Sequence, residues 1–143
     1  MTVRRFFAAR AGDPASMKPW RRRFRGGPEC VPAARHAVRE ELSGELDERR
    51  LQDVQLIVSE LATNSVRHAG CDEVMVEAAV EQECVRVRMC DDGDGFEERH
   101  PPGPPSPGAS GGFGLVLLER LSDRWGVQRE DEFCVWFEVA RSR

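Results

Sequence analysis

The sequence predicts an α+β fold, a two-layer sandwich in which a mixed, mostly antiparallel sheet carries its helices on one face. Two helical segments come first, and the second of them carries a continuous apolar stripe. Two alternating runs typical of strands follow, and after a long loop come a third helix and two more strands. The 143 residues are enough for one such domain, with a core that needs no disulfides.

The chain is basic at its start and acidic over the rest, with a formal net charge of −4. Residues 1–20 lack hydrophobic periodicity and are expected to form a basic, flexible leader to one domain spanning residues 21–143. An acidic domain lacks the surplus of lysine and arginine that neutralises phosphates, so no direct DNA binding is expected. No apolar run approaches the roughly 18 residues of a membrane span, so no membrane association is expected either.

The five cysteines are odd in number and contain no Cys-x-x-Cys pair. The usual spacing of metal-binding cysteines is therefore missing. The simplest expectation is that these residues are reduced thiols in a cytoplasmic protein.

An edge strand and two helices are predicted ahead of the first hairpin. Arg21–Arg25 suits a short edge strand, and Pro32 suits the first position of a helix that runs to Leu46. A second helix is expected to start near Asp47 or Glu48 and to stop at Gly70. Its spacing of i, i+3 and i+7 makes one stripe for a core, formed by Leu51, Val54, Val58, Leu61 and Ser65.

Two alternating runs, Val74–Val80 and Val85–Met89, predict a β-hairpin with one covered face and one wetter face. Arg86, Arg88 and Trp136 are expected on the exposed face of the sheet. Side chains of this kind are candidates for a dimer or partner contact.

The C-terminal half begins with a segment, Glu97–Gly112, that holds five prolines and several glycines. Such a composition predicts a long loop, which inside a compact domain is usually functional or disordered. Leu115–Trp125 is predicted as the third helix. A strand is expected from Val127, and alternation through Phe133–Val139 predicts the last one.

Glu60 and Asn64 are four residues apart on the second predicted helix, so they share one face. That face borders the apolar stripe, where an unpaired carboxylate or amide costs free energy. Asn64 can supply a carbonyl oxygen to Mg²⁺, and Glu60 can accept a hydrogen bond from a bound water or a substrate hydroxyl. A solvated pair on an amphipathic helix is the alternative for this spacing taken alone.

The run Asp91–Phe96, Asp-Asp-Gly-Asp-Gly-Phe, directly follows a predicted strand. Asp91 can accept a hydrogen bond from an adenine amino group, while Gly93 and Gly95 allow the backbone to approach a flat base. An ordinary turn is the alternative. A calcium loop is not expected, because the rest of a twelve-residue loop with its closing glutamate is missing.

The run Gly111–Leu115, Gly-Gly-Phe-Gly-Leu, opens the third predicted helix. The bare N–H groups of a first helical turn and the positive end of the helix dipole can hold phosphates. This run is neither a Walker loop, since no Gly-Lys-Ser/Thr follows, nor a Rossmann fingerprint, since no strand precedes it. A flexible hinge is the alternative.

The order of these three motifs is more specific than any one of them. It resembles the N, G1 and G2 boxes of the histidine-kinase-like (GHKL) ATPase superfamily, which includes gyrase, histidine kinases and mismatch-repair ATPases. The phrases Val58–Leu61, Asn64–Ala69, Asp123–Val127 and Val135–Glu138 are most similar to its branch of anti-sigma-factor serine/threonine-protein kinases. The resemblance covers about residues 24–140 and implies the Bergerat ATP-binding fold.

The resemblance also implies a role for each matched residue. Asn64 would bind the Mg²⁺ that bridges the phosphates of ATP, and Glu60 would be the general base toward a serine or threonine of a protein substrate. Asp91 would read the adenine, and residues 97–111 would form the ATP lid. Further nucleotide contacts are implied for His68, Gly93, Gly95, Phe96, Gly112, Phe113, Gly114 and Leu115.

Partners follow from the resemblance as well. They are a sigma factor that the kinase holds inactive and a STAS-type anti-anti-sigma protein that it phosphorylates; members of this branch often form homodimers. One alternative is a catalytically silent nucleotide-binding module that sequesters a regulatory partner. Another is a stand-alone catalytic domain that serves a histidine phosphorelay.

Overall fold

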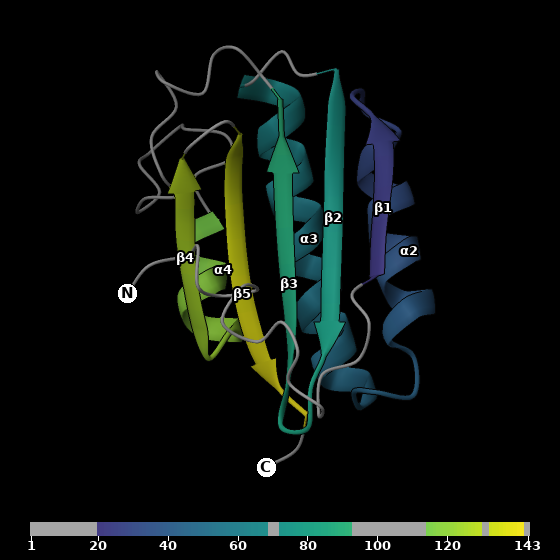
Figure 1. The fold of residues 1–143 in the computed structure, drawn as a ribbon, viewed down its shortest axis with the longest axis vertical. Helices are drawn as coiled ribbons and strands as arrows, with labels where there is room; N and C mark the ends of the chain where they lie inside the picture. The colour runs from purple at the N-terminus through teal and green to yellow at the C-terminus, as the bar shows by residue number, and fades with distance from the viewer. Residues whose placement is uncertain (1–19, 69–71, 93–113, 130–131, 142–143) are drawn as a thin grey trace.

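The computed structural model describes residues 20–68, 72–92, 114–129 and 132–141, which form one five-stranded sheet with helices on one face (Figure 1). The elements are β1 (Trp20–Arg25), α2 (Cys30–Leu42), α3 (Glu48–His68), β2 (Glu73–Val80), β3 (Cys84–Asp91), α4 (Gly114–Leu121), β4 (Arg124–Arg129) and β5 (Phe133–Ala140). The strand order is β1-β2-β3-β5-β4, and all neighbouring pairs are antiparallel. The predicted two-layer α+β fold is therefore confirmed; the predicted leader lies almost wholly outside the described residues.

The hydrophobic core lies between the helices and the face of the sheet that they cover. Alternate residues of β2, β3 and β5 point into it, as the sequence pattern predicted. The stripe of α3 is buried against this face: Leu51, Val54, Val58, Leu61 and Ser65. Since a fully buried aliphatic side chain contributes about 1.5–3 kcal/mol, this layer holds the helices to the sheet.

Asp47 determines where α3 begins. Its Oδ1 accepts a hydrogen bond of 2.8 Å from the backbone N–H of Arg50, and its carbonyl oxygen accepts the first helical bond from Leu51. These are the contacts of an N-cap, and the N–H of Arg50 lowers the pKa of Asp47 below its ordinary value. The predicted start of this helix is confirmed.

The bounds of α2 differ from the predicted ones. The helix begins two residues before Pro32, which fits within the first turn because the N–H groups there have no helical partner. It ends at Leu42 and not at Leu46, because Ser43 is extended and Gly44 takes a φ of 90°, in the left-handed region that favours glycine.

The third helix, α4, is shorter than predicted, and Trp125 is a strand residue. The backbone N–H of Ser122 closes the last helical turn on Leu118, and the next N–H, that of Asp123, donates to the carbonyl of Glu138 on β5. The chain therefore joins the sheet at Arg124, three residues before the predicted start at Val127. The polar run Ser122-Asp123-Arg124 lies at this boundary, and the predicted helix wrongly ran through it to Trp125.

The face of the sheet turned away from the helices is not the exposed surface that the sequence predicted. Arg86 and Trp136 are each only 1% exposed, and Arg88 is partly buried. Arg86 is buried as an ion-paired residue, in contact with Glu81 and Glu138.

Trp136 is buried on this face beside β4. Its indole lies over Gly126, directly across the β4–β5 pair, where a Cβ would come within 2.7 Å of Nε1. The absence of a side chain at Gly126 is what lets the ring lie so close to the strand.

Cys90 and Cys134 form a disulfide between β3 and β5. The expectation that every cysteine is a reduced thiol is wrong for this pair. The two residues are 44 positions apart, and only the antiparallel pairing of β3 with β5 puts them opposite each other, with Cα atoms 4.1 Å apart. Cys30 and Cys84 are free thiols, as expected.

Among the residues that the structure describes, none of the helices is long and apolar enough to cross a membrane.

The contact between Gly126 and Trp136 predicts the effect of adding one methyl group. Gly126→Ala should lower the free energy of unfolding by about 1–3 kcal/mol, because the indole must shift from its buried position. Urea denaturation followed by circular dichroism measures the change.

A double-mutant cycle with Trp136→Leu supplies the control for this prediction. Without the indole, the same glycine substitution should cost much less. Equal costs in the two backgrounds would mean that the strand itself, and not the ring, requires glycine.

Candidate functional site

Helix α3 presents Glu60 and Asn64 one turn apart, both partly buried, as predicted. Two neighbouring hydroxyls are satisfied within the helix: Ser59 Oγ donates to the carbonyl of Gln55 at 2.8 Å, and Thr63 Oγ1 donates to the carbonyl of Ser59 at 2.7 Å. The Glu60 carboxylate has no hydrogen bond or ion pair among the described residues. It is therefore able to accept a proton or a hydrogen bond from another molecule.

Asn64 carries a polar atom that the described part of the protein leaves unsatisfied. Its Oδ1 is buried and has no hydrogen-bond partner there. A buried carbonyl oxygen without a partner costs about 1–3 kcal/mol, so such atoms usually bind something. A neutral carbonyl oxygen is a suitable ligand for a hard divalent cation, which makes Asn64 fit the predicted Mg²⁺.

The buried carboxylate of Asp91 joins the end of β3 to helix α3. Ser65, the residue after Asn64, donates from Oγ to Asp91 Oδ2 at 2.6 Å, and Asp91 is 2% exposed. This bond brings the first and second motifs of the sequence together, although they are 26 residues apart. A carboxylate can accept about four hydrogen bonds, so the bond from Ser65 orients the group and leaves capacity for a ligand amine.

Asp92 has a structural role: it connects the end of β3 to the start of β2. Its Oδ1 accepts hydrogen bonds from the backbone N–H groups of Asp72 and Glu73, at 3.0 and 3.1 Å, where β2 begins. This role agrees with the expectation that the Asp-rich run is not a calcium loop.

One cluster of potential metal ligands occurs within the described residues. Cys90, Glu132 and Cys134 have ligand atoms within 4.8 Å of one another. The two sulfurs are bonded to each other, so neither is the thiolate that a metal requires.

The remaining predicted contacts are only partly described. His68 is the last residue of α3, and Gly114 and Leu115 open α4, which confirms that a helix starts at that glycine. Helix α4 packs beside α3, so its N-terminal end belongs to the same layer as Asn64. The other predicted contacts, Gly93, Gly95, Phe96, Gly112 and Phe113, lie outside the described residues, as does the predicted lid.

Ser65 is the site residue that sequence reasoning missed. It was assigned to the apolar stripe of its helix, and it is indeed 7% exposed, but its hydroxyl orients Asp91. A serine in an otherwise aliphatic stripe was the available signal, because a buried hydroxyl needs a partner.

Comparisons with known proteins agree with this arrangement. The family model described as "Histidine kinase-like ATPase domain" matches residues 24–138. A crystal structure of the RsbU and RsbW domains of a Mycobacterium tuberculosis protein superposes with a TM-score of 0.66 at 18% identity, over 89% of this chain and 33% of that one. At this identity the likeness shows the fold alone.

Three similar curated proteins are named serine-protein kinase RsbW. The one from Bacillus velezensis is 35% identical over 54% of this chain and 57% of its own length. The Bacillus subtilis protein is 33% identical over 59% and 61%, and a Listeria monocytogenes protein is 36% identical over 51% and 55%. The chain thus spans between about half and three-fifths of the length of these relatives.

The hydrogen bond between α3 and β3 can be tested by removing its donor. Ser65→Ala should lower the free energy of unfolding by about 1–3 kcal/mol, because the buried carboxylate of Asp91 loses a charge-assisted hydrogen bond. Chemical denaturation measures the loss.

Ser59→Ala on the same helix is the matched control, because its hydroxyl bonds mainly to its own helix backbone. This change should cost less than half as much. Equal losses at the two positions would contradict a special role for the bond to Asp91.

Proposed function

Because the chain belongs to the histidine kinase-like ATPase domain family, we propose that it binds ATP with Mg²⁺ and transfers the γ-phosphoryl group to a serine or threonine of a partner protein. In this proposal it is an anti-sigma factor, and the phosphorylated partner is an anti-anti-sigma protein of the STAS type. The observation that carries the proposal is the buried Oδ1 of Asn64, which has no hydrogen-bond partner in the described part of the chain, next to the hydrogen bond between Ser65 and Asp91.

Asp91 is the proposed reader of the base. Its carboxylate is buried at the end of the central strand, and the Ser65 hydroxyl fixes one of its oxygens. A fixed, buried acceptor suits the exocyclic amine of adenine, and it would disfavour guanine, whose equivalent position is a carbonyl oxygen. The site therefore favours ATP over GTP.

Asn64 is the proposed Mg²⁺ ligand. The cation would supply charge stabilisation for the phosphates. Asn64 Oδ1 is a buried carbonyl oxygen with no other partner among the residues that the structure describes, which suits such a role. The N-terminus of α4 is the proposed phosphate contact. This helix begins at Gly114 and lies in the same layer as α3, and the N–H groups of its first turn have no helical partners.

Glu60 is the proposed general base. The oxygen of the substrate hydroxyl forms a bond to the γ-phosphorus while the bond from phosphorus to the β–γ bridging oxygen breaks, and ADP leaves. The hydroxyl proton passes to the Glu60 carboxylate, which the described residues leave without a partner. One helical turn separates this base from Asn64, so both groups face the same reacting phosphoryl group.

The identity of the protein substrate is inferred from the relatives. They carry the name serine-protein kinase, and the order of the motifs in this chain resembles the branch that phosphorylates anti-anti-sigma proteins. A cytoplasmic location and a homodimeric state belong to the same proposal. Partner choice would then depend on phosphorylation, which adds about −1.5 to −2 charge to one of two competing partners.

A catalytically silent module that binds nucleotide and sequesters a partner is the second candidate. The Glu60 carboxylate has no partner among the described residues, and this favours the kinase, because a silent site has no need for such a partly buried acid beside the proposed metal ligand.

Nucleotide binding should depend on both Asn64 and Asp91. Isothermal titration calorimetry of the wild type with Mg²⁺ and ATP should show binding, and Asn64→Ala or Asp91→Asn should weaken it by roughly tenfold to a hundredfold. GTP should bind more weakly than ATP.

Gln52→Ala on the exposed face of α3 is the control for these two variants and should bind ATP normally. Folded wild-type protein that shows no heat of binding at millimolar ATP would overturn the proposal.

Phosphoryl transfer should depend on Glu60. With radiolabelled ATP and a panel of STAS-type proteins, Glu60→Gln should slow transfer by about 10²–10⁴-fold and leave the Kd for ATP nearly unchanged. Glu40→Gln, which changes an exposed carboxylate on α2, is the matched control. Binding without transfer in the wild type would favour the silent module.

A further inference from the structure

We propose that the Cys90–Cys134 disulfide is a redox switch that determines how tightly the site at the end of β3 binds nucleotide. This inference rests on the proposed function, because it assigns a regulator to the same site. In the oxidised protein the disulfide helps to hold Asp91 in position, and in the reduced protein the end of β3 loses this covalent connection to β5.

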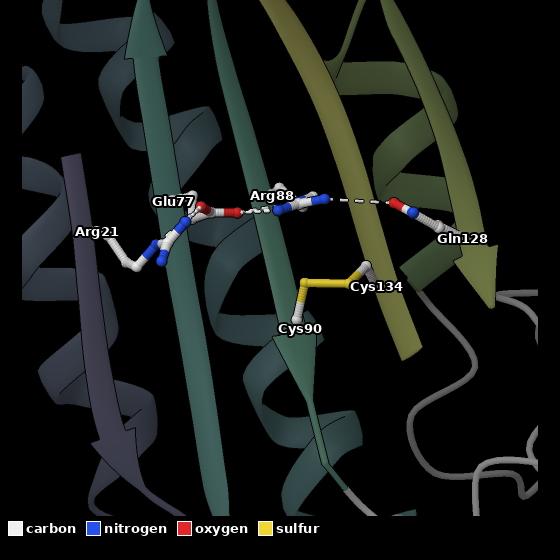
Figure 2. Close-up of polar contacts among 6 residues, drawn as sticks. All are labelled: Arg21, Glu77, Arg88, Cys90, Gln128 and Cys134. Carbon is white, nitrogen blue, oxygen red and sulfur yellow. Dashed lines mark hydrogen bonds and ion pairs between the residues drawn. A yellow bond between two sulfur atoms is a disulfide. The ribbon is translucent and has the colours of Figure 1, made fainter. Parts of the chain in front are cut away.

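The position of the disulfide next to Asp91 is the first argument. Cys90 immediately precedes Asp91 on β3, and successive side chains of a strand point to opposite faces. Asp91 therefore points toward α3, while the disulfide lies on the opposite face and joins β3 to β5 (Figure 2). Forming or breaking the disulfide therefore affects the backbone next to Asp91, the residue proposed to bind adenine.

Several contacts hold this end of β3, among them the pairing of Asp91 with β2 and β5 and its hydrogen bond from Ser65. Toward β2, Asp92 accepts hydrogen bonds from the backbone N–H groups of Asp72 and Glu73. Toward β5, the disulfide connects Cys90 to Cys134, the second residue of that strand. Strand ends open more readily than strand centres, so a covalent bond at this place has a large local effect. Of all these contacts, only the disulfide can be opened by reduction.

The disulfide is also separate from the main core. It forms a small cluster with Met75 on the face opposite the helices, whereas the main core lies beneath the helices. Opening the bond therefore need not disturb the packing that keeps the protein folded. Cys90 and Cys134 are themselves 2% and 4% exposed, so a reductant reaches the bond when this end of the strands opens.

The proposed cytoplasmic location of the protein supports a regulatory role for the Cys90–Cys134 disulfide. Cytoplasmic disulfides, where they occur, are usually transient and catalytic or redox-sensing. Reduction by a cellular dithiol breaks the S–S bond and gives two thiols, as two electrons and two protons pass from the dithiol, which becomes a disulfide. A small disulfide of the glutathione class, acting as oxidant, reverses the step and leaves as two thiols.

The two cysteines that the structure describes outside the disulfide, Cys30 and Cys84, do not have these properties. Burial raises the pKa of the Cys30 thiol, which makes it a weak nucleophile. Cys84 is at the other end of β3, seven residues from Asp91. Cys84 is therefore a matched control on the same strand.

The test compares oxidised protein with protein reduced by dithiothreitol, using the full chain and Mg²⁺-ATP as the probe. We expect reduction to raise the apparent Kd for ATP, measured by calorimetry, about threefold. This corresponds to a fall to about a third in the fraction of molecules whose Asp91 is positioned to bind adenine. Thiol titration before and after reduction verifies that two further thiols have formed.

Two variants locate the effect. Cys90→Ser/Cys134→Ser should bind ATP with the Kd of the reduced wild type, whatever the redox conditions. Cys84→Ser should keep the full response to reduction. Amide hydrogen exchange at Asp91 and Phe133, measured without nucleotide, should be faster in the reduced protein by at least the same factor.

Several results would overturn the proposal. One is an unchanged Kd after complete reduction with a lowered Tm, which would make the disulfide only a structural crosslink. Another is a response that persists in the double serine variant. If neither form binds ATP, the proposed function fails, and the exchange rate at Asp91 still decides the coupling: equal rates in both redox states would reject the switch.

Discussion

The central strand β3 pairs with β2 on one side and with β5 on the other, and the rest of the molecule depends on this double pairing. Because side chains alternate along a strand, β3 serves both faces of the sheet. Its inward residues pack into the core under α3 until the last of them, Asp91, replaces an apolar side chain with a carboxylate. The hydrogen bond from Ser65 then links that carboxylate to the helix that carries Glu60 and Asn64. The core and the proposed site are thus consecutive stretches of the same layer.

On the opposite face of the sheet, pairs of oppositely charged side chains lie on neighbouring strands. Figure 2 shows a row of polar side chains that come from β1, β2, β3 and β4 and pass over β5 as well: Arg21, Glu77, Arg88 and Gln128. Glu77 lies directly across from Arg21 on β1 and from Arg88 on β3. Buried ion pairs add little net stability, but opposite charges placed across from each other favour one register. A slip by one residue would carry these charges into the core, so the row specifies the strand pairing that also aligns Cys90 with Cys134.

Much of the fold was predictable because it depends on local periodicity. The stripe on α3 and the alternation in β2, β3 and β5 each follow from repeats of a few residues. The starts of α3 near Asp47 and of α4 at a glycine were also predictable from neighbouring residues alone. The boundary between α4 and β4 was not, because the backbone N–H that follows the helix, that of Asp123, donates to the carbonyl of Glu138, on a strand that comes later in the chain.

The sequence by itself determined the fold class, the order of the elements and the helical face shared by Glu60 and Asn64, since each of these depends on residues within one or two turns or strands. Only the tertiary structure decided that Ser65 orients Asp91, that Asn64 Oδ1 is buried without a partner in the described protein, and that Arg86 and Trp136 are buried. It also decided that two of the five cysteines are joined. These four features share one physical reason. Each depends on which strands and helices become neighbours, and residue spacing along the chain does not predict contacts made across a sheet.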